Sequence, residues 1–169
     1  MDRLPATLSL ALGAVEIELA QVVLADEAEF DSYLLGAAAA IAGLALGGRL
    51  PGDDPGARFA ASAGGVVRLV EIVRDLPRDA RRGRVFLPWA WVEQEKASLD
   101  ELQSGADADA RCRLAVRLAD LARRRWAEAA AEAAQAPALP HRRSLWVLAQ
   151  LHLALLADME RTGFRAGPA

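Results

Sequence analysis

Residues 68–84 read RLVEIVRDLPRDARRGR, and no other stretch of the chain is like this one. It places six arginines and three acidic residues among leucine, isoleucine and valine. Asp75 and Asp79 are four positions apart, so a helix would place both carboxylates on one face, one turn apart. Pro77 lies between them, and a proline inside a helix removes a hydrogen bond and crowds the preceding turn. We therefore expect this helix to stop or kink near Leu76.

The composition around this stretch favours helix. The chain has 169 residues, of which 53% are hydrophobic and 25% charged, as in a globular domain of ordinary size. Alanine and leucine, both strong helix formers, supply most of the apolar share, whereas only 5% of the residues are aromatic. An all-β sandwich is therefore excluded. We expect one all-α helical bundle over residues 1–169.

Apolar spacing and turn signals predict five main helices. Their expected bounds are 5–25, 27–46, 54 to 75 or 79, 108–135 and 141–162, with short helical pieces at 89–96 and after Ser98. In the first helix, spacings of three and four predict one inward stripe of Leu8, Leu12, Val15, Leu19 and Val22. The run LLGAAAAIAGLAL at 34–46 is too short to cross a bilayer. It predicts a buried helix, with contact to a membrane surface as the alternative.

Charge and cysteine content exclude several classes of protein. The formal net charge is −3 and the pI is near 5.4, so no global positive field would recruit nucleic acid. The single Cys112 excludes an intrachain disulfide framework and a cysteine-built zinc site. These features indicate a cytoplasmic protein, with association to a membrane as the alternative.

The charged stretch allows two interpretations on its residues alone. Two carboxylates on one helix face suit a hard cation such as Mg²⁺, which brings phosphate oxygens with it. Neighbouring arginines hold a diphosphate through forked, charge-assisted hydrogen bonds. The first interpretation is therefore a magnesium–diphosphate site, and the second is a solvated helix end with salt bridges.

Other residues also allow a functional and a structural interpretation. Trp89 and Trp91 would form a lipid-facing lip or pack under the loop before them. Arg123–Arg125 would touch an anionic partner or form a solvated face. His152 is expected to be a core histidine, and Cys112 a helix-surface thiol. The two histidines and the cysteine form no metal or nucleophile pattern of known spacing.

The segment 72–88, IVRDLPRDARRGRVFLP, resembles the second aspartate-rich motif of the squalene/phytoene synthase family. That motif is an R-D-x-x-x-D helix followed by an R-G-R-[YF]-L-P loop. Three further pieces resemble the family in the same order, namely FDSY at 30–33, LP at 139–140 and ERTGF at 160–164. The resemblance covers nearly the whole chain, but only the C-terminal part of a family member.

The resemblance implies an isoprenoid-synthase-like fold and a chemistry. Family enzymes join two prenyl diphosphates head to head, with Mg²⁺ held by two aspartate-rich motifs on facing helices. By position, Asp75 and Asp79 would be the metal ligands of the second motif. The residues in place to contact diphosphate are Arg74, Arg78, Arg81, Arg82 and Arg84.

The chain also departs from the family pattern. The first aspartate-rich motif has no counterpart, and Arg68 and Glu71 stand where the family has glutamine and asparagine. We therefore expect a truncated, degenerate and non-catalytic member, without the family's N-terminal helices, that binds a prenyl diphosphate or a protein partner. The alternative is a farnesyl or geranylgeranyl diphosphate transferase whose first motif comes from a second chain. Apolar surface left by absent helices predicts a homodimer or a partner subunit.

Overall fold

The computed structural model describes residues 6–20, 24–45, 55–135 and 142–164. These residues form the helices α1 (Ala6–Ala20), α2 (Glu27–Ala45), α3 (Pro55–Arg81), α4 (Trp89–Gln94), α5 (Leu99–Ser104), α6 (Ala108–Gln135) and α7 (Arg142–Arg161). Within these ranges, extended pairing is limited to an isolated parallel bridge between Leu24 and Pro88. The expected all-α fold, with five long helices, is confirmed.

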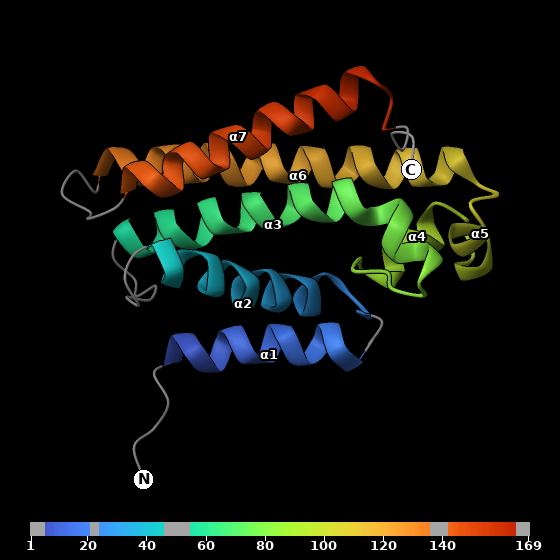
Figure 1. Cartoon of the computed structure of the whole chain (residues 1–169), viewed down its shortest axis with the longest axis horizontal. Coiled ribbons are helices and arrows are strands. Elements are labelled where there is room, and N and C mark those ends of the chain that lie inside the picture. The colour runs from blue at the N-terminus through green and yellow to red at the C-terminus, as the bar shows by residue number, and fades with distance from the viewer. Residues whose placement is uncertain (1–5, 21–23, 46–54, 136–141, 165–169) are drawn as a thin grey trace, which may run out of the picture.

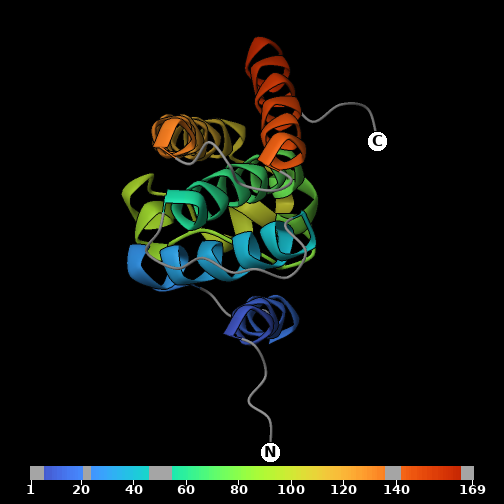
Figure 2. The same cartoon turned by 90° about the vertical axis from the view of Figure 1, so that its left-hand side faces the viewer.

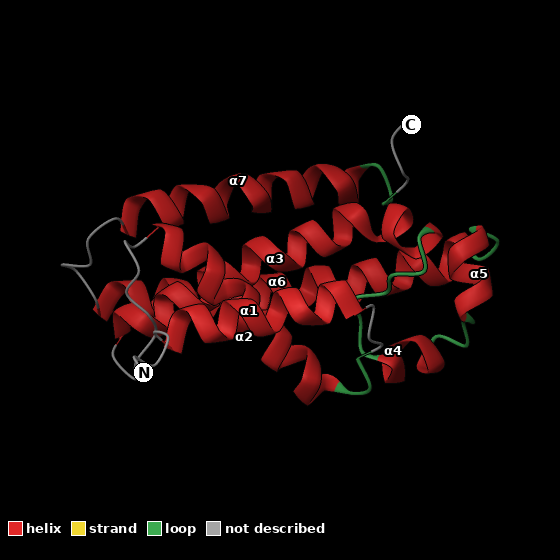
Figure 3. Cartoon of the chain, turned by 60° about the horizontal axis from the view of Figure 1, so that its bottom comes forward, coloured by secondary structure: helices red, strands yellow, loops and turns green. Residues whose placement is uncertain are grey.

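The long helices form layers around α3 (Figure 1). One flank of α3 packs on α6 and α7, and the other packs on α2, which in turn packs on α1. Seen end on, α1 is the outermost layer, with α2 on one side of it (Figure 2). The short helices α4 and α5 lie near one end of the bundle, joined by loops (Figure 3). The hydrophobic core therefore lies along α3.

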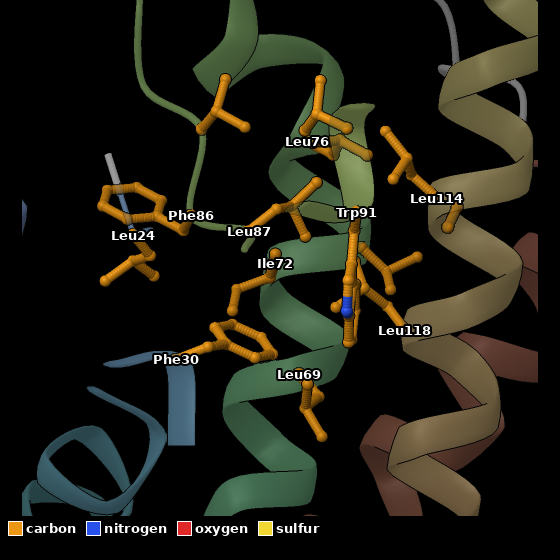
Figure 4. Packing of buried hydrophobic residues seen from close by; sticks show 14 of the residues in the cluster. Leu24, Phe30, Leu69, Ile72, Leu76, Phe86, Leu87, Trp91, Leu114 and Leu118 are labelled. Atoms are coloured by element: carbon orange, nitrogen blue, oxygen red, sulfur yellow. The ribbon is translucent and has the colours of Figure 1, made fainter. Parts of the chain in front are cut away.

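Side chains from both flanks meet on α3 (Figure 4). Leu69, Ile72 and Leu76 of α3 are buried. Their surroundings are Phe30 of α2, Phe86 and Leu87 of the loop after α3, Trp91 of α4, and Leu114 and Leu118 of α6. Full burial of a leucine stabilises the fold by about 1.5–3 kcal/mol. Packing along α3 is therefore the main apolar contribution that holds the layers together.

Two glycines allow the outer layers to approach closely. A Cβ at Gly36 of α2 would lie 2.6 Å from the backbone oxygen of Leu10 in α1. A Cβ at Gly64 of α3 would lie 2.9 Å from the backbone oxygen of Ala38 in α2. A side chain at either position would push two helices apart, so these glycines set the spacing of α1, α2 and α3.

The third helix does not stop near Leu76, because α3 continues through Pro77 to Arg81, two residues beyond the later of the two expected ends. Proline in a helix interior costs about 3 kcal/mol. Leu76, just before Pro77, is 4% exposed, and Ala80, three residues after it, is fully buried. If the helix stopped at Pro77, this apolar burial would be lost. The helix ends where Gly83 takes a φ of 75°, and its N–H donates to the carbonyl of Ala80.

The expected inward stripe on the first helix is also wrong. Leu8, Leu12, Val15 and Leu19 are all exposed, whereas Ala14 is buried. The reason is tertiary: α1 has α2 on one side only, and the small Ala14 fits that contact better than leucine does. Val22 lies outside the described residues. The expected continuation to residue 25 is wrong as well, because Leu24 is extended and pairs with Pro88.

Most other expected boundaries agree with the structure. The helix at 108–135 is confirmed, and Ser98 and Glu101 form the predicted capping box of α5. The 34–46 run forms most of α2, with Leu34 and Ala38 buried. Residue 46, the predicted cap at 54 and the predicted helix start at 141 lie outside the described residues.

Candidate functional site

Arg68 lies at the centre of a polar group that joins three helices. We call it the Arg68 cluster: Glu18 of α1, Tyr33 of α2, and Arg68 and Glu71 of α3. The Arg68 guanidinium donates to the Tyr33 hydroxyl and, over 2.6 Å, to Glu18 Oε1, and it lies 3.3 Å from Glu71 Oε2. Tyr33 Oη donates to the same Glu18 oxygen over 2.9 Å. Arg68 and Tyr33 therefore each donate to a partner on another helix, and Arg68 also pairs with Glu71 of its own helix.

Aromatic rings enclose the guanidinium. Tyr33 and Phe86 stack with centroids 5.8 Å apart, and the Arg68 Cζ lies 5.4 and 5.6 Å from the two centroids. Only 17% of the Arg68 side chain is exposed, and Tyr33 is fully buried. The cluster thus holds one positive charge against an apolar wall, where cation–π attraction adds to the ion pairs.

Burial and charge set the protonation of the cluster. Burial raises the pKa of the Tyr33 hydroxyl well above its usual range, although the charge and hydrogen bond of Arg68 act in the opposite direction. Burial alone would lower the pKa of Arg68, but its interactions with Tyr33, Glu18 and Glu71 outweigh burial and raise that pKa. Tyr33 is therefore a neutral phenol and Arg68 a fixed cation over the whole neutral range.

The continuous α3 brings Asp75 and Asp79 to one face, one turn apart, as their spacing predicts. Both carboxylates are engaged by arginines of the same helix. A carboxylate oxygen of Asp75 lies 2.8 Å from a guanidinium nitrogen of Arg74 and 3.0 Å from one of Arg78. A carboxylate oxygen of Asp79 lies 3.3 Å from the Arg78 Nε. The hydrogen bond from Arg74 lowers the pKa of Asp75 despite partial burial. The carboxylates share a face, as the interpretation as a magnesium–diphosphate site requires. They also form salt bridges, as the interpretation as a charged helix end predicts.

The arrangement does not fit a preformed Mg²⁺ site. Magnesium requires near-octahedral oxygen ligands, commonly one or two carboxylates with waters and phosphate oxygens. Both oxygens of Asp75 contact arginines. Among the described residues, no group of three or more acidic, histidine or cysteine side chains lies close enough to hold a metal ion. A metal ion would have to displace these arginines.

The other predicted arginines lie at the end of α3 and in the loop after it. Arg81 and Arg82 are exposed, and no ion pair within the described part of the chain involves them. Arg84 is half-buried, and its Nε is buried without a hydrogen-bond partner among the described residues. These three side chains therefore offer guanidinium donors that carboxylates do not already occupy.

The acidic group at 26–29 serves the fold. Asp26 accepts from the N–H of Glu29, and Glu29 accepts from the N–H of Ala25, which caps the start of α2. Glu27 accepts from the indole of Trp91 and from Arg117. These carboxylates are therefore occupied by capping and by contacts between helices.

Trp91 and the basic turn take their structural interpretation. Trp91 is 5% exposed and packs edge-on against Phe30. The expected core position of His152 is wrong, because this side chain is partly exposed, with its Nδ1 2.8 Å from the carbonyl of Leu148 in its own helix. Arg123 pairs with Glu160, and Arg125 with Asp31, so most of this basic turn is neutralised.

A cavity of about 400 Å³ opens on a different face of α3 from the aspartates. Its walls include Val73, Pro77, Cys112 and Phe164. The carboxylates of the charged stretch are absent from this lining. The expected surface position of Cys112 agrees with its place at this cavity, where it is partly exposed.

The model of the squalene/phytoene synthase family matches residues 7–168. The chain belongs to that family. Its fold matches squalene synthase HpnC from Alicyclobacillus acidocaldarius with a TM-score of 0.78 and 21% identity, over 96% of this chain and 61% of that one. The chain thus spans about three fifths of the length of this family member. No curated protein matches it.

Sequence reasoning missed two members of the Arg68 cluster. Glu18 interrupts the apolar stretch of the first helix, and Tyr33 is the one tyrosine in the chain. Both features were signals of a buried polar contact. Their partner could not be identified, because 35 residues separate Tyr33 from Arg68 and 50 separate Glu18 from it. None of the described helices is long and apolar enough to cross a membrane.

Proposed function

We propose that this family member binds a prenyl diphosphate and does not condense it. The observation that supports this proposal is the Arg68 cluster, in which a guanidinium is fixed two helical turns before Asp75 by Glu18, Tyr33 and Glu71. By the resemblance, the family has glutamine and asparagine on the turns that Arg68 and Glu71 occupy here. A guanidinium cannot ligate a metal ion, and Glu18, Tyr33 and Glu71 already occupy its donors. This part of α3 therefore supplies no ligand for the metal ions that ionise an allylic diphosphate, and binding of the anion falls to the arginines after Asp79.

The arginines after Asp79 support binding of the anion. Arg81 and Arg82 are exposed, and Arg84 Nε lacks a partner among the described residues. A diphosphate accepts forked hydrogen bonds from such donors. Mg²⁺ would enter with the diphosphate, because Asp75 and Asp79 are already paired with arginines. We therefore expect the protein alone to bind Mg²⁺ only weakly.

The first experiment is a product assay. Purified protein is incubated with Mg²⁺ and farnesyl or geranylgeranyl diphosphate, and apolar products and released diphosphate are quantified. We expect both to match an Asp75→Asn/Asp79→Asn variant. Squalene, phytoene or diphosphate above that level contradicts the non-catalytic proposal.

The second experiment is calorimetry with a non-hydrolysable farnesyl diphosphate analogue. Arg81→Ala/Arg82→Ala should weaken binding about tenfold or more, because each charge-assisted hydrogen bond is worth about 1.5 kcal/mol or more. The matched control is Arg143→Ala, an exposed arginine at the start of α7. Equal affinity in both variants, or no binding by the unaltered protein, contradicts the proposal.

A second candidate function is a transferase completed by another chain. It is favoured by the retained Asp75 and Asp79 on one face of α3, and by the chain's span of 61% of the HpnC squalene synthase. The test is to add a candidate partner that carries an aspartate-rich helix. Product that requires both the partner and Asp75 supports this candidate over the first.

A further inference from the structure

The outward side of α1 carries four exposed apolar side chains. Leu8, Leu12 and Val15 are 44, 43 and 47% exposed, and Leu19 is 75% exposed. We call this set the α1 seam. From it we propose that α1 pairs antiparallel with α1 of a second copy of this chain. The proposal is independent of any ligand bound near α3.

The seam lies opposite the contact with α2. Successive helix residues are about 100° apart around the axis, so the four seam residues fall within one narrow stripe. On the same count Leu10, Ala14 and Ile17 lie on the reverse side. There the Leu10 backbone and Ala14 approach Gly36 of α2 closely, and Ile17 packs against the core. The helix therefore has two apolar faces. Among the described elements, α2 lies against one of them (Figure 2), where Ala14 is buried and Leu10 remains 37% exposed.

The spacing of the seam is that of a helix pair. Leu8, Leu12, Val15 and Leu19 are separated by four, three and four positions, which is the a/d repeat of a coiled coil. The seam is also symmetric about a point between residues 13 and 14. In an antiparallel pair related by a two-fold axis at this point, Leu8 lies opposite Leu19 and Leu12 opposite Val15. One copy therefore supplies all the apolar partners that the other requires.

Charge favours a second copy over a membrane. The described part of α1 contains Glu16 and Glu18 and no lysine or arginine, whereas helices that lie on membranes are rich in basic residues. Glu16 is exposed and would be repelled by anionic lipid. Antiparallel packing also places the positive N-terminal end of each helix dipole beside the negative end of the other.

The size of the contact predicts a weak dimer. Each copy contributes one face of a helix of 15 residues. The area that such a face buries is smaller than the roughly 800 Å² that each partner buries in a standard interface. We therefore expect a reversible dimer with a dissociation constant in the micromolar range.

The first test is sedimentation velocity from about 1 to 200 µM. The unaltered chain should shift from 18.0 kDa toward twice that mass. Leu12→Glu should weaken association roughly thirtyfold or more, the effect of losing a central contact. The matched control, Leu151→Glu, alters a residue of α7 that is 63% exposed and should leave association unchanged. Circular dichroism shows whether each variant keeps its helices.

The second test addresses orientation. Leu12→Lys and Val15→Glu should each dissociate the dimer, and the double variant should recover part of it, because the new ammonium group of one copy then faces the new carboxylate of the other across the antiparallel pair. A parallel pair would instead place like charges together. The proposal is overturned if the unaltered chain stays monomeric at 200 µM or binds anionic vesicles. It is also overturned if Leu12→Glu still dimerises, or if the double variant stays as dissociated as the single ones.

Discussion

Two arginines on the same helix have contrasting surroundings. Arg68 has 17% of its side chain exposed and binds Glu18 and Tyr33 from two other helices. Arg78, ten residues later, has 52% of its side chain exposed, and its ion pairs within the described residues are with Asp75 and Asp79 of its own helix. A charge whose partners come from other helices fixes how those helices pack. A charge paired along its own helix can exchange its partner for a ligand at little cost to the fold.

The largest expected effect comes from removing the buried charge. Arg68→Ala removes the cation at the junction of three helices and leaves Glu18 with the Tyr33 hydroxyl as its donor. We expect a loss of about 2–3 kcal/mol in the free energy of unfolding, because breaking a buried pair leaves the other partner uncompensated. Urea denaturation at pH 7 measures this loss.

Arg78→Ala is the matched control for this prediction. Its ion pairs are largely solvated, so the loss should be below about 1 kcal/mol. If Arg68→Ala and Arg78→Ala lower the free energy of unfolding by the same amount, the different surroundings of the two arginines do not affect stability. Arg68→Met combined with Glu18→Gln removes both charges, and it should cost less than Arg68→Ala alone.

An intermediate effect is expected at high pH. The pKa of Tyr33 is raised in the fold by burial, so the folded state keeps the proton that the unfolded chain releases near pH 10. The contribution of Tyr33 to the free energy of unfolding should therefore be constant below about pH 10 and fall above it by about 1.4 kcal/mol per pH unit.

The single tyrosine makes this effect directly measurable. The absorbance change of phenolate formation should coincide with the alkaline loss of helical circular dichroism. Tyr33→Phe should lose about 1 kcal/mol at neutral pH, from its missing hydrogen bonds, and should remove the steep fall above pH 10. A phenol that titrates near pH 10 while the helices stay intact contradicts the burial argument.

The smallest effect is expected at Asp75. Its pKa is lowered in the fold, first by the hydrogen bond from Arg74, so its contribution is present above the unfolded pKa of about 4 and is lost as the pH falls below that value. Asp75→Asn should cost less than about 1 kcal/mol at pH 7. Denaturation at pH 7 and pH 3 should show a smaller difference in this variant than in the unaltered chain. If the free energy of unfolding changes by the same amount between pH 7 and pH 3 in both proteins, the ion pair of Asp75 has no net stabilising effect.

Local rules predicted the elements that depend on neighbours in the chain. The helix at 108–135 follows from its apolar spacing, and the capping box of Ser98 and Glu101 from two residues three apart. The common face of Asp75 and Asp79 follows from helix geometry alone. In each case the deciding contacts lie within one or two turns.

Local rules failed where burial overrides them. Pro77 does not end α3, because Leu76 and Ala80 are buried on either side of it. The leucine stripe of α1 faces outward, because the close approach at Gly36 favours the small Ala14 in the contact with α2. Periodicity identifies an apolar face, but it does not show which of two such faces the fold covers.

Composition and short-range spacing were enough to predict the all-α class and most helix boundaries, and the resemblance of the 72–88 motif indicated the family. The packing of the helices was needed to show that Arg68 joins Glu18 and Tyr33, that Asp75 and Asp79 are paired with arginines, and that the α1 seam is exposed. The physical reason is that pairing and burial depend on which residues, distant along the chain, the packed helices bring within contact distance.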